Sequence, residues 1–212
     1  MANKKCFAYL YAAAFPFAAE DKMISFAPRA EEISACSNEF LRKQKFYVWK
    51  LLEFATVDAL GLKLDLLNLK RDKNGKWHSD KCCFSLTHSK NVVAVALSDN
   101  PIGVDAERVD SQRFDAALEN RIATQAEKTM FGDRFAHAER VCALWTRKES
   151  MFKREGEKVF RPCVADACFS GCRSFFLKGL NDEFILSAAG DSMSQAILFS
   201  PFENVVWSEE IK

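Results

Sequence analysis

The chain has no basic arm or stripe, no paired metal-binding cysteines and no long apolar run. Its 212 residues carry 30 Lys and Arg against 29 Asp and Glu, a formal net charge of +1. Because these charges are spread along the chain, we expect no nucleic-acid partner. No stretch is long and apolar enough to span a membrane, so we expect no membrane partner either. What is present, an apolar content of 49%, is enough to bury a substantial core.

Cysteine is plentiful but lacks the spacing of a metal site. The eight cysteines include no pair of Cys-X-X-Cys motifs. Cys163, Cys168 and Cys172 come closest to a cluster, and no histidine stands near them to complete a zinc site. The sequence therefore predicts reduced thiols in the core and on the surface of a cytoplasmic protein.

The N-terminal segment admits two interpretations. Asn3-Lys4-Lys5 is charged, and the apolar, small-residue stretch from Cys6 to Ala19 follows it, which is the pattern of a secretory signal. A buried first strand has the same composition. The residues of this segment alone do not separate the two.

Two carboxylates lie in a short segment that we predict to be a strand. Ile102 and Val104 alternate with Asp105 and Glu107, so the period of two places the apolar pair on one face and both acids on the other. Like charges on one face repel unless a cation lies between them. An exposed strand face is the alternative interpretation.

A third carboxylate and a lysine follow about forty residues later. Glu149 and Lys153 are four apart on a predicted helix, turned away from Leu144 and Met151. Three carboxylates with room for water and phosphate are typical of a Mg2+ site. An ordinary surface ion pair is the alternative for Glu149 and Lys153.

Four blocks of sequence, in order, resemble one family. Residues 102–107 and 145–153 resemble the signature of the Sfp-type 4'-phosphopantetheinyl transferases, and Phe84-Ser85-Leu86-Thr87-His88-Ser89 and Gly75-Lys76-Trp77 resemble two further blocks. The resemblance spans roughly residues 65–156. It implies transfer of the 4'-phosphopantetheine arm of coenzyme A to a serine of an acyl or peptidyl carrier protein, with release of 3',5'-ADP.

The same resemblance implies roles for the charged residues. Asp105, Glu107 and Glu149 would hold Mg2+ against the pyrophosphate. Lys153 would lie beside the phosphates and offset their charge. Glu149 is also the candidate to take the proton of the incoming serine, directly or through a metal-bound water, and its roles as metal ligand and as base compete. Glu149 and Lys153 are thus the predicted catalytic residues.

Coenzyme A needs further donors at its nucleotide end, where it carries a 3'-phosphate. His88 would contact that phosphate, Thr87 would keep a family hydroxyl, and Gly75 would let the backbone approach the ligand. The residues implied to bind coenzyme A are Arg71, Gly75, Lys76, Ser85, Thr87 and His88. Taken alone, a histidine such as His88 is more often structural than a ligand, and residues 70–76 are a charged hairpin tip.

The chain departs from the family in three places. Ser85-Leu86 replaces Asn-Ile, and Trp77 replaces the proline after Gly-Lys. Glu31-Glu32 stands where the family usually has a basic residue that reaches the 3'-phosphate. The candidates to replace that basic residue are Arg42, Lys43, Lys45 and Lys50. Glu127 matches a recurring family glutamate, and its role is open.

The expected fold is α+β, with two similar α+β halves related by a pseudo-two-fold axis. The predicted halves are residues 1–100, the nucleotide clamp, and residues 101–212, the Mg2+ site and catalytic helix. Each half has one long helix, predicted at Glu39–Leu60 and Ala136–Glu155. The strands expected to follow these helices are Leu66–Leu69, Cys82–Leu86 and Val92–Leu97 in the first half, and Phe175–Leu177, Phe184–Ala188 and Ala196–Phe199 in the second.

The resemblance to this family favours one interpretation of the N-terminal segment and of the cellular location. Because coenzyme A is a cytoplasmic cofactor and the family begins with a strand, we expect a cytoplasmic protein whose N-terminal segment is a strand. We expect a monomer, with the variable residues 109–137 facing the carrier protein; burial of their aromatic residues in the core is the alternative. A Mg2+-dependent phosphohydrolase and a non-catalytic coenzyme A binding module are the rival functions.

Overall fold

The structure is a computed structural model that describes residues 7–16, 24–156, 159–162, 167–179 and 181–211. Cys163 and the charged residues 3–5 lie outside the described residues. The helices are α1 (Ala27–Ser34), α2 (Glu39–Leu60), α3 (Ala116–Ile122), α4 (Gln125–Lys128) and α5 (His137–Glu155), with 3-10 turns η1 (Leu64–Leu67) and η2 (Met193–Gln195). The strands are β1 (Ala8–Ala14), β2 (Lys70–Arg71), β3 (Trp77–His78), β4 (Cys83–Ser89), β5 (Val92–Ser98), β6 (Ile102–Arg108), β7 (Cys172–Gly179), β8 (Asp182–Gly190), β9 (Ile197–Phe199) and β10 (Val205–Ile211).

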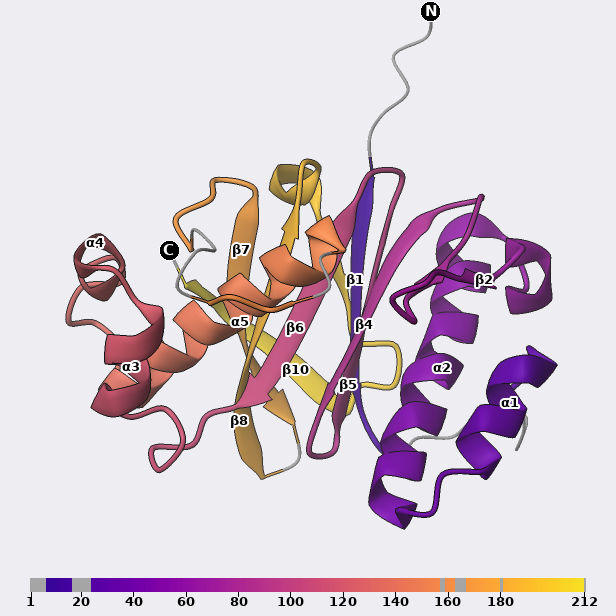
Figure 1. The fold of residues 1–212 in the computed structure, drawn as a ribbon, viewed down its shortest axis with the longest axis horizontal. Helices are drawn as coiled ribbons and strands as arrows, with labels where there is room; N and C mark the ends of the chain where they lie inside the picture. Colours follow the sequence, from indigo (N-terminus) through magenta and orange to yellow (C-terminus); the bar gives the residue numbers. More distant parts are fainter. Residues whose placement is uncertain (1–6, 17–23, 157–158, 163–166, 180, 212) are drawn as a thin grey trace, which may run out of the picture.

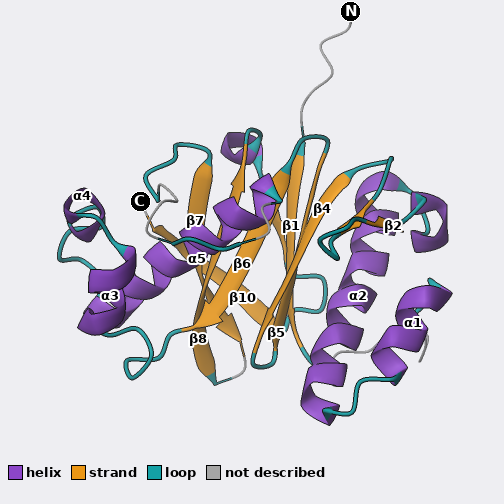
Figure 2. Cartoon of the chain, in the orientation of Figure 1, coloured by secondary structure: helices purple, strands orange, loops and turns teal. Residues whose placement is uncertain are grey.

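Two four-stranded sheets form the centre of this α+β fold (Figures 1 and 2). Their strand orders are β4-β5-β1-β9 and β10-β7-β8-β6. In the first sheet β1 and β4 both pair antiparallel with β5, and in the second β6 and β7 both pair antiparallel with β8. A long helix precedes the second of these strands in each sheet: α2 lies between β1 and β4 in the chain, and α5 lies between β6 and β7. The two sheets therefore repeat one strand–helix–strand–strand connection.

The central strands are apolar on both faces because both faces are buried. Along β5, Val92, Ala94 and Ala96 pack toward the second sheet, whereas Val93, Val95 and Leu97 pack under α2. Strands covered on both sides carry continuous rather than alternating apolar residues. The run Ala8–Ala14 is a strand of this kind between β5 and β9, which confirms the buried-strand interpretation of the N-terminal segment.

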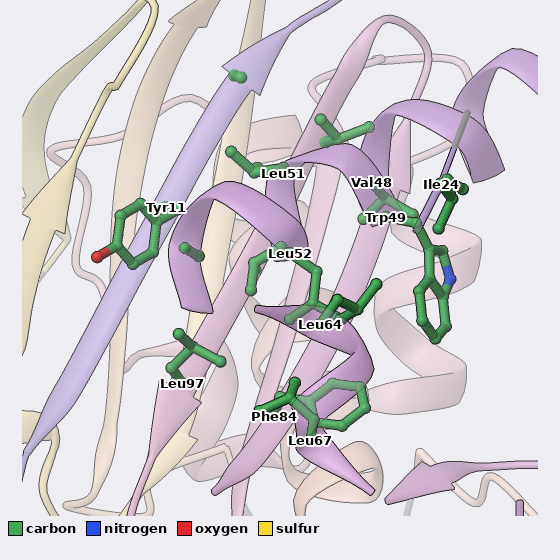
Figure 3. Close-up of a cluster of buried hydrophobic side chains, with 14 of the residues drawn as sticks. Tyr11, Ile24, Val48, Trp49, Leu51, Leu52, Leu64, Leu67, Phe84 and Leu97 are labelled. Atoms are coloured by element: carbon green, nitrogen blue, oxygen red, sulfur yellow. The ribbon is translucent and has the colours of Figure 1, made fainter. Parts of the chain in front are cut away.

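Helix α2 covers the outer face of the first sheet, and Figure 3 shows the core beneath it. Asn38 caps its start by accepting a hydrogen bond from the Leu41 N–H, and Gly61 ends it at φ 65°. Leu51 and Leu52 of the helix are fully buried with Tyr11 and Leu97 of the sheet. The prediction of a helix at Glu39–Leu60 is confirmed.

Helix α5 covers the second sheet. The Glu139 carboxylate accepts the Ala136 N–H at its start, and Gly156 ends it at φ 69°. Val141 and Leu144 pack against Phe176 and Ile185 of the sheet. The prediction of a helix at residues 136–155 is thus confirmed to within one residue.

Two of the strand predictions are corrected. Residues 64–67 form a 3-10 turn because Leu64 and Leu67, three apart, both enter the core under α2, a spacing that a strand does not give. Ile197–Phe199 is a strand, but it pairs parallel with β1 in the first sheet instead of extending the second. The other predicted strands are present, and none of the helices in the described part of the chain is long and apolar enough to cross a membrane.

Candidate functional site

The candidate site lies where α5 crosses β6. Ile102, Val104 and Ala106 face the core between the sheets, so the alternate residues of the strand face α5. Gly103 marks the closest approach, since a Cβ there would lie 1.9 Å from the Ser150 carbonyl oxygen. Only glycine lets the helix pack this closely on the strand. This close packing brings the helix residues following Ser150 against Asp105.

Asp105 is almost fully buried, with 6% of its surface exposed. Its Oδ1 accepts hydrogen bonds from Lys153 Nζ at 2.7 Å and from Thr87 Oγ1 at 3.0 Å. Its Oδ2 is also buried and has no hydrogen-bond partner among the described residues. Burial raises the pKa of Asp105, and Lys153 opposes this rise. The site therefore contains one buried carboxylate oxygen that lacks a donor or cation.

Glu107 is already paired on both oxygens. Arg113 donates to Oε1 at 2.7 Å and Ser89 donates to Oε2 at 2.8 Å. The Arg113 guanidinium in turn lies over the rings of Phe114 and Trp145, at 5.0 and 5.7 Å. Trp145 lies one helical turn before Glu149, so Arg113 connects α5 to the second acid of the strand.

Glu149 is a partly buried carboxylate with no hydrogen bond or ion pair to any described residue. Burial raises its pKa from the ordinary value of 4.5 to about 7, and the negative charge of Asp105 contributes to the rise. A carboxyl group that titrates near neutral pH is suited to accepting a proton. The structure thus brings Asp105, Glu149 and Lys153 together as predicted.

The three carboxylates suit a hard divalent cation in their chemistry, and the unpartnered Asp105 Oδ2 and Glu149 are oxygen donors of the kind that Mg2+ prefers. Within the described residues, however, no three His, Cys, Asp or Glu side chains form a ready metal-binding group. Lys153 lies against Asp105 and Arg113 against Glu107 instead. Two of the three predicted metal ligands, Asp105 and Glu107, are thus paired with cations of the chain itself, and the metal-ligand role stays a prediction.

The raised pKa of Glu149 predicts a pH-dependent stability. In the unfolded chain Glu149 ionises near 4.5, but in the folded protein it does so near 7. Between these values the folded state binds the extra proton, so its contribution to the free energy of unfolding falls as pH rises, by up to about 1.4 kcal/mol per pH unit. Because glutamine resembles the protonated acid, we expect the unfolding free energy of wild type to be close to that of Glu149→Gln at pH 5 and to fall below it as the pH rises to 7.

Urea unfolding at pH 5, 6 and 7, in buffer with EDTA to remove metal, measures this difference. Glu39→Gln, which removes an exposed carboxylate paired with Lys43 on α2, is the matched control. Parallel pH profiles for wild type and Glu149→Gln would contradict the raised pKa.

Three hydroxyls of β4 join the two sheets. Ser85 accepts the Val104 N–H, Thr87 the Ala106 N–H and Ser89 the Arg108 N–H, at 3.0 to 3.3 Å. The hydroxyls thus supply acceptors for the edge of β6 that no strand covers. Ser85 is 5% exposed, so this geometry gives it a structural role and no surface for coenzyme A. Thr87 reaches the site through Asp105 rather than through a ligand.

His88 and Lys76 lie at the same end of the site as Lys153. Burial lowers the pKa of His88, and the charges of Lys153 and Lys45 lower it further. Lys76 Nζ donates to the Lys153 carbonyl oxygen at the end of α5. Of the four basic candidates from the first fifty residues, Lys45 is the one whose charge acts on His88.

Arg71 and Gly75 belong to the β2–β3 hairpin, which confirms the predicted charged hairpin tip. Gly75 has a φ of 86°, and Arg71 donates to its carbonyl oxygen and to Glu32. The Arg71 guanidinium is therefore held within the hairpin and by α1, and no contact with Asp105 or Lys153 is present among the described residues.

Two features were missed from the sequence. One is the Arg113 pair with Glu107. The other is a fully buried ion pair, in which Glu127 Oε1 accepts from Lys148 Nζ at 2.8 Å with 3% and 0% of the side chains exposed. Glu127 also accepts the N–H groups of Thr124 and Ala167. The available signal was the position of Lys148 beside the buried face of the predicted helix, because a buried lysine requires an acid as its partner.

Comparison with known families agrees with this geometry. Residues 101–188, which run from the turn before β6 through α5 to β8, match the family model described as the 4'-phosphopantetheinyl transferase superfamily. No curated protein matches the chain significantly. The matched segment contains Asp105, Glu107, Glu149 and Lys153 together. The name of the matched family refers to transfer of 4'-phosphopantetheine.

Proposed function

We propose that this chain, whose residues 101–188 match the 4'-phosphopantetheinyl transferase superfamily model, is an Sfp-type enzyme that transfers the phosphopantetheine arm of coenzyme A to a carrier-protein serine. The observation that carries the proposal is the meeting of Asp105 with Lys153, 2.7 Å apart, beside a Glu149 whose pKa is about 7. This arrangement provides a cation for phosphate and a base for a hydroxyl within one small volume.

In the proposed reaction the serine Oγ attacks the phosphorus that carries pantetheine. The bond from this phosphorus to the bridging oxygen breaks, and 3',5'-ADP leaves with that oxygen. Glu149 takes the serine proton. Lys153 moves from Asp105 to the pyrophosphate and offsets the charge that builds up on the leaving group. Burial of these side chains strengthens each of these interactions.

Mg2+ is the metal we propose, with Asp105 and Glu149 as its first ligands and Glu107 beside them. When bound, it would neutralise charge on the pyrophosphate under attack. Asp105 supports this assignment through its buried Oδ2, which lacks a partner among the described residues.

We further propose that the nucleotide end of coenzyme A binds to His88, Lys76 and Lys45.

We also propose that the two strand–helix–strand–strand units are related by a pseudo-two-fold axis. The repeated pairing of the strands in the two sheets supports this symmetry. A monomeric protein of the cytoplasm, where coenzyme A is found, is part of the same proposal. The acceptor is an acyl or peptidyl carrier protein.

The test is direct. Purified protein is incubated with Mg2+, coenzyme A and apo carrier proteins from fatty acid, polyketide and peptide synthesis, and intact-protein mass spectrometry measures addition of one phosphopantetheine arm. A carrier with its serine replaced by alanine is the control. If coenzyme A binds but no carrier gains the arm, a non-catalytic binding module replaces the transferase. Release of 3',5'-ADP without any carrier would instead favour a phosphohydrolase.

His88 gives a more specific prediction about the 3'-phosphate. We expect His88→Ala to weaken binding of coenzyme A about ten- to a hundredfold, because a hydrogen bond to a charged phosphate contributes roughly 1.5 to 3 kcal/mol. Binding of 3'-dephospho-coenzyme A, which lacks the contacted group, should change little. Isothermal titration calorimetry with both ligands measures the difference.

The control for this prediction is His137→Ala, since His137 pairs with Glu119 at the start of α5 and lies outside the proposed site. It should leave both affinities unchanged. An equal loss of affinity for the two ligands in His88→Ala would remove His88 from the 3'-phosphate site.

A further inference from the structure

Glu107 is held by a set of contacts that extends beyond the predicted site. Its Oε1 accepts from Arg113 and its Oε2 from Ser89. Arg113 follows β6 by a short turn, in which Asp110 accepts the N–H groups of Gln112, Arg113 and Phe114. The turn therefore fixes the point from which the guanidinium reaches back to the strand.

The guanidinium is positioned by two aromatic rings as well as by the carboxylate. It lies 5.0 Å from the centre of the Phe114 ring and 5.7 Å from that of Trp145. Phe114 is fully buried, so one wall of this contact is rigid. A planar guanidinium stacks on aromatic rings and pairs with a carboxylate at the same time, which a lysine does not do equally well.

This contact matters for the metal because a carboxylate oxygen that binds a guanidinium is not available to a cation. Asp105 retains a buried oxygen with no partner among the described residues, whereas both oxygens of Glu107 are engaged. The two acids of one strand face therefore differ in readiness to bind metal. The difference comes from Arg113 and Ser89, since both acids belong to the same strand.

We propose that Arg113 is a positioning residue that competes with the divalent metal for Glu107 and so sets the metal affinity of the site. The inference rests on the metal requirement within the proposed function. Its chemistry is an exchange of ion pairs only: Glu107 releases the guanidinium when it binds the metal, and Arg113 keeps its contacts with the aromatic rings. Because 48% of the Arg113 side chain is accessible, water can solvate the guanidinium where it lies against the rings once Glu107 has left it.

Mn2+ binding to the full-length protein, followed by electron paramagnetic resonance without coenzyme A or carrier, tests the inference. We expect Arg113→Ala to tighten Mn2+ binding by up to about fivefold, which corresponds to loss of an exposed competing ion pair of up to about 1 kcal/mol. Arg108→Ala, which removes a positive charge from the end of the same strand where it pairs with Asp110 and Asp182, corrects for the general loss of charge.

The double variant Arg113→Ala with Glu107→Gln identifies the carboxylate involved. If Arg113 acts through Glu107, the gain in Mn2+ affinity disappears in the double variant, because glutamine has no carboxylate to offer the metal. The proposal is overturned if Arg113→Ala binds Mn2+ no more tightly than Arg108→Ala, or if the double variant keeps the gain. Thermal unfolding confirms that each variant is folded.

This test separates the inference from the proposed function. If the wild-type protein shows no transfer activity but the variants give the expected Mn2+ results, the transferase proposal is overturned and the role of Arg113 stands. Normal transfer with unchanged Mn2+ affinity in Arg113→Ala would do the reverse.

Discussion

Asp105→Asn is expected to lower the rate of phosphopantetheine transfer by at least about a hundredfold, while the protein stays folded. The substitution removes the charge that holds Lys153 at 2.7 Å and a proposed metal ligand, and loss of one preorganised electrostatic group costs this much or more in comparable sites. Mass spectrometry of a carrier protein, with time and at saturating Mg2+, measures the rate.

Stability should not fall with activity in this variant. Burial raises the pKa of Asp105, which means that ionised Asp105 is disfavoured in the folded protein before any metal binds. Asparagine keeps a side-chain oxygen for Thr87 and removes repulsion from Glu107. Lys153, with 28% of its side chain exposed, can turn to solvent.

Asp182→Asn is the matched control, since Asp182 pairs with Arg108 on the neighbouring strand and is 42% exposed. It should retain wild-type transfer. Near wild-type turnover in Asp105→Asn would show that the site is assigned to the wrong residues, and the same result in Glu149→Gln would remove the proposed base.

Glu127→Ala is expected to reduce the free energy of unfolding by about 3–5 kcal/mol, the usual cost of breaking a buried ion pair from one side. Lys148 is 0% exposed and lies 2.8 Å from Glu127, so the substitution leaves its ammonium buried without that carboxylate. The Thr124 and Ala167 N–H groups lose their acceptor as well. The hydrogen bonds from Lys148 and from these backbone groups outweigh burial and lower the pKa of Glu127, as expected for a carboxylate that stays ionised.

Urea unfolding at pH 7 measures this loss, with Glu139→Ala as the control. Glu139 accepts the Ala136 N–H at the exposed start of α5, as Glu127 accepts the Thr124 N–H, but without a buried lysine. Its loss should cost only about 1 kcal/mol. A similar small cost for Glu127→Ala would show that the buried pair contributes little to stability. Glu127, whose role the sequence leaves open, connects α4 with α5 and with residue 167 in this structure.

Local patterns in the sequence determined much of the fold. The two long helices and β6 were predicted within one residue at each end, because the spacing of apolar residues reflects local backbone geometry. The same local geometry placed Asp105 and Glu107 on one face of a strand and Glu149 and Lys153 on one face of a helix. The order of the four family blocks then indicated phosphopantetheine transfer.

Contacts between distant residues were decided only by the tertiary structure. Lys153 binds Asp105 across 48 residues and Lys148 binds Glu127 in the core, and no local period indicates which acid a lysine will meet. Ser85 matched a ligand-binding block, yet its hydroxyl accepts the Val104 N–H because β4 packs beside β6. Ile197–Phe199 joined the first sheet for a similar reason, since β1 had a free edge. The sequence by itself determined which elements carry the charged groups; the packing of sheets and helices determined which of those groups meet, because pairing depends on three-dimensional distance.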